Sequence, residues 1–414
     1  MSAFNIALSG LNAASTDLSV TSNNIANAST VGFKESRTEF ADVFAASFGG
    51  LSKTAVGDGV TVSQVAQQFD QGNLEFTGNA LDVAVNGQGF LIYSDSGTQV
   101  YSRNGALNVD RDGYVVNAQT QRLQVYDVVD PNIPTFNTGS LSDLQLQSGD
   151  APPNATANVD ILLNLSAQAP DLGAGVIDPT DPNTYSYSTS LNVFDSLGAS
   201  HTATTYFRKI DSVANSWDVS LYIDGTAPAN NVTAGGLAQT NMTFNTDGTL
   251  NTGSPIVYDA YPIPGANPIN ITYDYAGSTQ YGDQFTVNAL TQDGYTTGRL
   301  NSINIDETGT IFARYTNGQA LALGRVALGD FANKQGLQQL GDNAWAQTFS
   351  SGDLQLGEAG AGSFGLIQSG SLEASNVDLS EQLVNLIVAE RNYQANAEVI
   401  STADTLTQTI INLR

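Results

Sequence analysis

The chain of 414 residues carries 14 Lys and Arg against 40 Asp and Glu, which gives a formal charge of −26. This charge excludes nucleic acid and anionic membrane surfaces as partners, since both require basic patches. The absence of cysteine excludes disulfides, thiol chemistry and thiolate metal sites. No apolar run approaches the roughly 20 residues that span a bilayer, so we expect no membrane insertion. The length allows two or three domains.

The first segment, residues 1–30, is predicted to form an amphipathic helix over residues 2–28. Asp17 is its only charged side chain, so the helix lacks both a solvated charged face and the charged flanks of a two-stranded coiled coil. We therefore expect contacts on several of its sides. Its apolar face consists of Phe4, Leu8, Leu11, Ala14, Leu18 and Ile25.

A connector over residues 31–72 follows, in which Gly32 ends the helix. The alternation of Val60, Val62 and Val65 predicts a strand, and the connector is interpreted as a β-hairpin, with an ordinary loop as the alternative. Residues 73–145 are predicted to be β throughout, with strands at 81–85, 90–93, 114–116 and 123–128. The Asp110-Arg111-Asp112-Gly113 run between two of them lacks the distal Glu of a calcium loop and is interpreted as a turn.

Proline sets the next segment apart, because all twelve prolines of the chain fall between Pro131 and Pro268. Proline cannot donate to a sheet ladder, so residues 146–284 are predicted to form a separate, loop-rich β domain inserted into the first. Strands are expected at 185–194, 201–209, 217–223 and 269–275. Residues 285–358 then complete the first β domain, with strands at 300–305, 309–315 and 320–327, and 359–370 is expected to be a flexible linker.

The last segment, residues 371–414, contains neither Gly nor Pro and is predicted to be a second, longer helix. Asp378 and Glu381 have the spacing of a capping box at its start. A helix over 379–413 would be roughly 50 Å long. Its apolar stripe recurs every three or four residues and consists of Leu383, Leu386, Ile387, Tyr393, Ala397, Ile400, Ala403, Leu406, Ile410 and Leu413.

The apolar stripes of the two helices must be buried away from water, and their periodicity leaves two possible partners. Either the terminal helices pair with one another and with other copies, which makes the chain a subunit of a polymer, or both pack on the middle domain of their own chain.

Few residues of the chain are candidates for catalysis or metal binding. His201, the only histidine, has no second His or Cys to share a metal and is expected to be a plain surface residue.

Two further patterns with possible chemistry also have simpler readings. Gly360, Gly362 and Gly365 match G-x-G-x-x-G, but no strand of a βαβ unit precedes them. Asp178 and Asp181 have the residue type of a glycosidase acid pair, but nothing marks a cleft around them. The sequence therefore predicts no catalytic residue, no cofactor and no metal. A surface adhesin and a glycan hydrolase remain as alternatives to a structural protein.

The two ends of the chain carry long motifs in a fixed order. Residues 22–34 include Asn23, Asn24, Asn27, Gly32 and Phe33, and residues 370–379 and 388–396 include Ser375, Asn376, Val377, Asp378, Arg391 and Asn392. Both runs resemble the signatures of the bacterial flagellar rod and hook proteins. Residues 81–90 are similar to the strand and turn of that family, and 290–295 resemble the point at which hook proteins return to their middle domain. Only about 140–280 has no such counterpart.

The resemblance implies a multidomain α+β fold, with a coiled-coil-like pair of terminal helices, a discontinuous all-β middle domain and an inserted all-β outer domain. It implies a homopolymer, a curved tube that transmits torque from rod to filament. The implied partners are the distal rod, the hook cap, the hook-filament junction proteins and the type III export apparatus, which exports subunits to the flagellum without cleavage. Rod subunits are shorter, so the insertion favours a hook subunit, with a distal rod protein as the alternative.

On this interpretation, the residues that mediate self-assembly belong to both terminal helices. They are Phe4, Leu8, Leu11, Leu18, Asn23, Asn24, Ile25, Asn27, Leu383, Leu386, Ile387, Tyr393, Ile400, Leu406 and Ile410.

Overall fold

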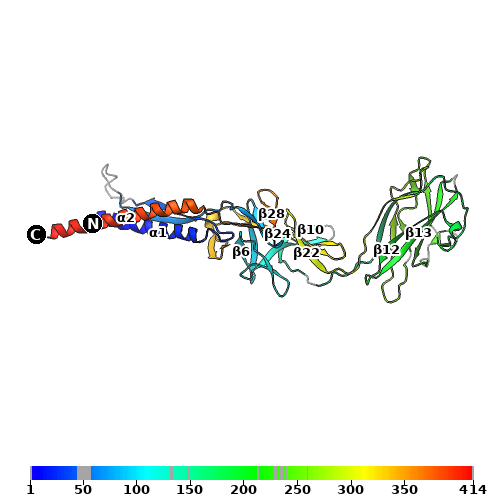
Figure 1. Ribbon diagram of the computed structural model, residues 1–414, viewed down its shortest axis with the longest axis horizontal. Helices are drawn as coiled ribbons and strands as arrows, with labels where there is room; N and C mark the ends of the chain where they lie inside the picture. Colours follow the sequence, from blue (N-terminus) through cyan, green and yellow to red (C-terminus); the bar gives the residue numbers. More distant parts are fainter. Residues whose placement is uncertain are drawn as a thin grey trace. The chain divides into compact units, whose positions relative to one another are not determined.

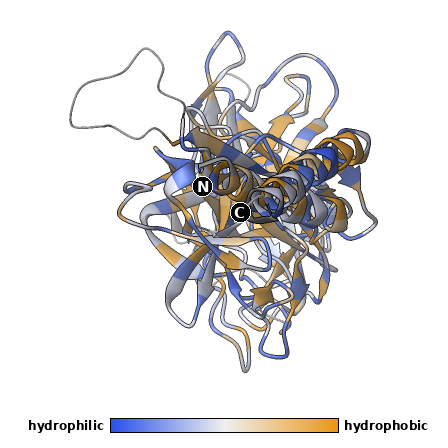
Figure 2. Ribbon diagram, turned by 90° about the vertical axis from the view of Figure 1, so that its left-hand side faces the viewer, coloured by the Kyte–Doolittle hydropathy of each residue, from blue (hydrophilic) through white to orange (hydrophobic). Residues whose placement is uncertain are grey.

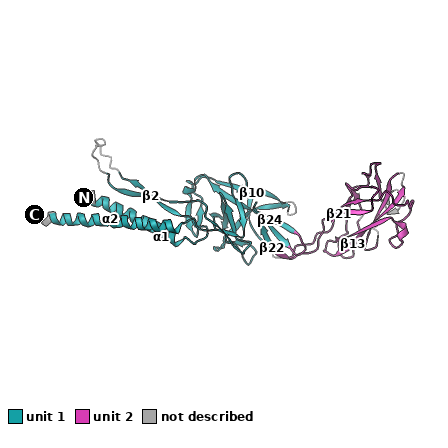
Figure 3. Cartoon of the chain, turned by 45° about the horizontal axis from the view of Figure 1, so that its top comes forward, with its two compact units in different colours: residues 1–148, 302–314, 320–414 teal, residues 149–301, 315–319 magenta. Residues whose placement is uncertain are grey.

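A computed structural model describes residues 2–43, 57–130, 134–146, 149–211, 214–226, 232–233, 237–238, 240–258 and 260–412. Helices lie at the two ends of the chain and strands between them, which confirms the predicted multidomain α+β class (Figure 1). The chain divides into two compact units (Figure 3). Unit 1 comprises residues 1–148, 302–314 and 320–414, and unit 2 comprises residues 149–301 and 315–319.

The terminal helices of unit 1 are α1 (Ser2–Ala26) and α2 (Leu379–Asn412). They run antiparallel, because Asn24 near the end of α1 contacts Gln382 near the start of α2, and Gly10 lies against Asn396. A Cβ atom at Gly10 would come within 2.5 Å of the Asn396 side chain, so a larger residue would displace that amide. Asp378 caps α2, since its Oδ1 accepts hydrogen bonds from the backbone N–H groups of Ser380 and Glu381.

A β-hairpin follows α1. Its strands β1 (Ser36–Asp42) and β2 (Val60–Gln67) pair antiparallel, with Phe40 opposite Val62. Both strands of the hairpin pack beside α1, and α1 in turn packs along α2 (Figure 1).

The remainder of unit 1 is a β domain in which a long sheet has the order β22-β23-β24-β9-β5-β6-β26-β25. Two buried clusters fill it, one around Leu91, Val125 and Leu328, and one around Phe90 and Trp345. Its elements are β3 (Leu74–Phe76), β4 (Val83–Asn86), β5 (Phe90–Asp95), β6 (Thr98–Ser102), β7 (Asn108–Val109), β8 (Val115–Val116), β9 (Arg122–Asp130), β10 (Thr135–Asp143), β22 (Leu300–Ile305), β23 (Thr310–Tyr315), β24 (Ala320–Phe331), η2 (Lys334–Gly336), β25 (Gln338–Gly341), β26 (Ala344–Ala346), β27 (Leu354–Glu358), β28 (Leu366–Ser369) and β29 (Ser371–Glu373).

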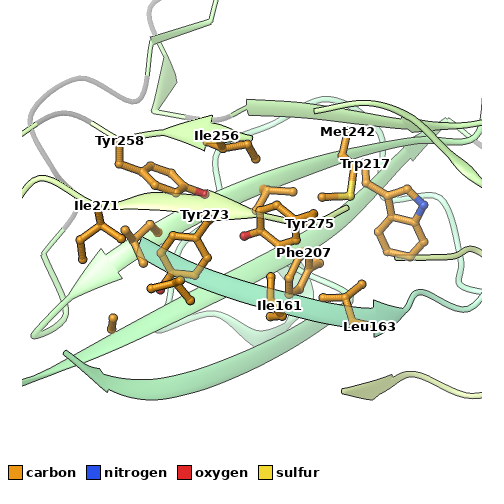
Figure 4. Close-up of a cluster of buried hydrophobic side chains, with 14 of the residues drawn as sticks. Ile161, Leu163, Phe207, Trp217, Met242, Ile256, Tyr258, Ile271, Tyr273 and Tyr275 are labelled. Atoms are coloured by element: carbon orange, nitrogen blue, oxygen red, sulfur yellow. The ribbon is translucent and has the colours of Figure 1, made fainter. Parts of the chain in front are cut away.

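Unit 2 contains two main sheets, with the orders β19-β20-β11-β21 and β12-β13-β14-β17-β18. Its core combines aliphatic residues with large aromatic ones, among them Trp217, Phe207, Tyr273 and Tyr275 (Figure 4). Its elements are β11 (Asn158–Asn164), η1 (Pro182–Thr184), β12 (Tyr187–Phe194), β13 (Ser200–Asp211), β14 (Ser216–Ile223), β15 (Val232–Thr233), β16 (Leu237–Ala238), β17 (Thr240–Phe244), β18 (Leu250–Thr252), β19 (Ile256–Val257), β20 (Thr272–Asp274) and β21 (Thr286–Gln292).

Three boundaries differ from the sequence-based expectation. Unit 2 continues past residue 284, because β21 pairs with β11 and extends that sheet. The expected linker at 359–370 contains β28, which pairs with β4. Residues 371–373, at the start of the segment assigned to the second helix, form β29, paired with β3, and the helix itself begins at Leu379, directly after the expected cap at Asp378. In each case, a strand distant in the sequence supplies the hydrogen-bonding partner.

Candidate functional site

Small and polar side chains of α1 are buried where it packs against α2 and the hairpin. Ala7, Gly10, Ala14, Thr21 and Asn24 recur along α1 at multiples of three and four residues, and each is buried except Gly10, which is half-buried. Gln382 and Ala389 are buried on α2, and Asn24 Nδ2 donates to Gln382 Oε1 at 3.1 Å. This inner seam follows the period of a coiled coil without its large apolar residues.

The large apolar residues that the sequence singles out mostly face away from the inner seam. Phe4 is 45% exposed, Leu8 41% and Ile387 50%. Leu383, Tyr393 and Leu406 are exposed as well, whereas Leu11, Leu18, Ile25, Leu386 and Ile400 are half-buried. Figure 2 views the helix pair from its end, with apolar residues in orange. Ile410 lies in α2, its side chain is outside the described part of the structure, and Leu413 lies outside the described residues.

Sequence reasoning missed part of this surface. Val384 and Val388 on α2, and Phe40 and Val65 on the hairpin, are large apolar residues left exposed. It also missed the inner seam, because alanine and glycine contribute little to an apolar stripe. Their recurrence along α1 at three and four residues is the signal that identifies them.

A groove runs between α1, the hairpin and α2. It consists of two adjoining hollows of about 510 and 280 Å³, which share the residues Asp17 and Phe40. We call it the terminal groove. Asn392, from the C-terminal motif, lines it, whereas Arg391 is exposed on the neighbouring face of α2.

Motif residues from the two ends meet at the base of the helices. Glu373 Oε1 accepts from Lys34 Nζ at 2.6 Å and from the backbone N–H of Gly72 at 2.9 Å, and its Oε2 lies 3.3 Å from Arg103 Nη1. All three charged side chains are almost completely buried. Lys34, Arg103 and Glu373 are called the Glu373 cluster below.

Burial determines the electrostatics of the Glu373 cluster. It lowers the pKa of Lys34, and the Glu373 carboxylate partly offsets this effect by favouring the charged amine. Burial lowers the pKa of Arg103 in the same way, again against Glu373. Two buried cations thus share one carboxylate, and the backbone carbonyl of Asp70 accepts a further hydrogen bond from Lys34 Nζ at 2.7 Å.

Further hydrogen bonds join the two motifs. The backbone N–H of Glu35 donates to Asn376 Oδ1 at 2.7 Å, and Asn376 Nδ2 donates to the Gln68 carbonyl at 2.9 Å. The backbone N–H of Gly32 donates to the Glu373 carbonyl at 2.7 Å, and Phe33 is buried. Ser375 and Val377 are half-buried and Asp378 is exposed. Asn23 is exposed, and Asn27 Nδ2 donates back to the Asn23 carbonyl. Asn376, together with the backbone of Gly32 and Glu373, therefore holds the chain ends together.

His201 is not the plain surface residue that the sequence predicts. The imidazole lies between two carboxylates, with Nδ1 2.6 Å from Asp224 Oδ2 and Nε2 3.5 Å from Asp195 Oδ2. Burial lowers the pKa of His201, but the two carboxylates outweigh burial and raise it above its ordinary value. The carboxylates face opposite ring nitrogens, so the three side chains do not converge on one point. Among the described residues, no group of three or more His, Asp or Glu has the arrangement of a metal site.

The remaining sequence candidates lie in local turns. Asp178 Oδ1 accepts from the backbone N–H of Thr180, and Asp181 caps η1. Asp110 Oδ1 accepts from the backbone N–H groups of Asp112 and Tyr114. Gly360 and Gly362 adopt positive φ in a turn. No helix in the described part of the chain is long and apolar enough to cross a membrane.

Four protein families match consecutive parts of the chain. Residues 4–34 match "Flagella basal body rod protein", residues 84–149 "Flagellar hook protein FlgE/F/G D1 domain", residues 163–295 "Flagellar basal body protein FlaE D2 domain", and residues 368–413 "Flagellar basal body rod FlgEFG protein C-terminal".

Known proteins are similar to this chain over its whole length. The flagellar hook protein FlgE of Salmonella typhimurium is 38% identical, over 99% of this chain and 100% of that protein, and the FlgE of Borreliella burgdorferi is 32% identical, over 98% of each. A crystal structure of Helicobacter pylori flagellar hook protein FlgE2 shares the fold, with a TM-score of 0.55 and 16% identity over 72% of this chain and all of that chain. Since relatives of 32% identity or more match it from end to end, the chain belongs to the flagellar hook protein family.

Proposed function

We propose that this chain is the structural subunit of a bacterial flagellar hook and assembles into a curved tube that transmits torque from the rod to the filament. The role is structural rather than enzymatic. One observation carries the proposal: small residues close the inner seam of the helix pair, while large apolar residues on both helices stay exposed. Burying each of them completely would contribute about 1.5 to 3 kcal/mol, so a few such residues suffice to drive assembly.

The proposal places the subunit in the flagellar hook, with the distal rod, the hook cap and the junction proteins as neighbours and the type III export apparatus as its route. Support comes from relatives named as hook proteins along their full length, which favours a hook over a distal rod subunit. A tube that bends at fixed torsional stiffness needs neighbours that slide without parting. Contacts with few ion pairs suit such sliding, because few charges must separate at each turn.

Electron microscopy of the purified, assembled chain tests the proposal. Short curved tubes support a hook subunit, whereas straight rigid tubes would indicate a rod subunit. The variants Leu8→Asp and Ile387→Asp should remain folded and fail to assemble, because each places a carboxylate in the exposed apolar surface. Asn12→Asp, on an exposed polar position of α1, is the matched control and should assemble normally. Tubes formed by both apolar-site variants would contradict the proposal.

A further inference from the structure

We propose that the terminal groove receives helix α2 of a second copy of this chain, with Asp17 of the groove paired to Arg391 of that copy. This inference rests on the proposed function. The larger hollow of the groove is apolar, with Ala13 and Ala14 of α1, Phe40 and Val60 of the hairpin, and Ala395 of α2 in its lining. Glu35 and Arg37 line the smaller hollow, where Arg37 is already paired with Glu39 at 3.0 Å. Phe40 is 47% exposed, so the groove can still be closed by another apolar surface.

Asp17 gives the groove a charge preference. It is the only charged residue of α1, it is half-buried, and it lies where the two hollows meet. Its carboxylate forms no ion pair or hydrogen bond with any residue that the structure describes. An apolar occupant that covered Asp17 without a cation would strand a buried carboxylate, which is costly. The occupant must therefore be apolar and carry one positive charge.

Helix α2 meets both requirements. Arg391 is its only Lys or Arg between Leu379 and Asn412, and it too forms no ion pair within the described chain. Val384, Ile387 and Arg391 are spaced by three and four residues, so they share one face of the helix. That face lies opposite the buried Ala389 and is exposed, with Val384 at 60%. An arginine fork is suited to a carboxylate held in such a groove.

The other exposed helical stripe is a poorer occupant. Phe4 and Leu8 lie on α1, which has no Lys or Arg at all, so docking that stripe would leave Asp17 without a partner. The Arg391 face of α2 adjoins the groove, since Val388 and Ala395 line the groove while Val384, Ile387 and Arg391 stay exposed beside it. Each copy can therefore offer its groove to one neighbour and its Arg391 face to another. Such a head-to-tail contact extends without closing on itself, as a helical polymer requires.

Charge reversal tests the contact in the full-length chain. Asp17→Arg and Arg391→Asp should each raise the concentration needed for assembly at least about tenfold, since like charges then meet in the groove. The double variant should restore assembly. A mixture of the two single variants should also assemble, because an Arg at 17 then meets an Asp at 391 of the other variant, and the remaining wild-type pairs are intact.

The mixture separates a contact between copies from one within a chain, because mixing cannot repair a pair inside one molecule. Failure of the mixture, or normal assembly of either single variant, would overturn the proposed contact. Asn12→Arg and Ser401→Asp change charge at exposed positions outside the groove and should assemble normally, and circular dichroism should show all variants folded. If wild-type chains form tubes, only the contact is at stake. Wild-type chains that form none would overturn the proposed function as well.

Discussion

At the scale of single residues, Glu373 accepts hydrogen bonds from segments that are far apart in the sequence. Lys34 and Gly72 precede it by 339 and 301 residues, and Arg103 lies beside the other carboxylate oxygen. Replacing Glu373 leaves two buried cations without their counter-charge. Glu373 should therefore contribute more to the free energy of unfolding than an ion pair at the surface does.

Glu373→Ala is expected to lower the free energy of unfolding by about 3 to 5 kcal/mol, because it strands Lys34 and Arg103. Glu358→Ala is the control, since Glu358 and its partner Arg325 are both partly exposed and their pair is worth about 1 kcal/mol or less. Urea denaturation of the unassembled chain measures both changes. Equal effects of the two substitutions would contradict the role assigned to burial.

His201 provides a prediction for pH. Because its pKa is raised above the ordinary 6.5, its contribution to stability is fully present below about pH 6.5 and is lost as the pH rises through the folded-state pKa. The pKa of Asp224 is lowered, chiefly by its hydrogen bond to His201 against the effect of burial. The contribution of the Asp224 carboxylate to stability is therefore present above about pH 3.8 and is lost as the pH falls through its folded-state pKa.

As the only histidine, His201 gives a single imidazole signal in an NMR titration. The titration should give an apparent pKa above 6.5, and Asp224→Asn should lower it. Asp247→Asn, at an exposed turn whose carboxylate bonds only to Thr249, should leave it unchanged. A wild-type value below 6.5 would show that burial outweighs the two carboxylates.

At the scale of elements, the helix boundaries decide which truncations the fold tolerates. Helix α2 begins at Leu379, after β29 and the Glu373 cluster. A chain without residues 1–26 and 379–414 should remain a folded, soluble monomer that forms no tubes, because it loses only the helices. A chain cut back to residue 370 also loses Glu373 and β29 and should unfold at a lower temperature. Thermal denaturation and electron microscopy distinguish these outcomes, and equal melting temperatures would contradict the prediction.

Local signals accounted for the elements that sequence reasoning identified. The cap at Asp378 marked the start of α2, and the alternation around Val62 marked β2. The strand at 366–369 was missed because its glycine-rich surroundings are typical of a linker, and its partner β4 is some 280 residues away. The partners of His201 and the terminal groove were missed for the same reason, since each forms only when distant segments meet.

At the scale of the whole molecule, the charge of −26 opposes association between copies. Unit 2 contributes strongly, with fourteen Asp and no Glu against three Lys or Arg in the sequence. Of these three cations, Arg208 and Lys209 are buried. Copies that come together must therefore overcome a repulsion that salt can screen.

We expect the concentration required for assembly to fall as sodium chloride is raised from about 20 to 200 mM, because the Debye length shortens over this range. Light scattering at a series of protein concentrations measures the change. Sucrose at matched osmolarity is the control, since it adds no screening ions. If the protein concentration required for assembly rises with salt, attraction between charges dominates assembly rather than apolar contact.

The position of Glu373 near the end of the chain also sets the order in which the parts can fold. A chain that emerges with its amino terminus first exposes Lys34 and Arg103 long before the carboxylate that neutralises them. The core of unit 2, drawn from residues 159–275, is complete well before then, so it can condense early. The base of unit 1 stays open until residue 373 is free, so a chain interrupted before that point cannot neutralise the buried Lys34 and Arg103.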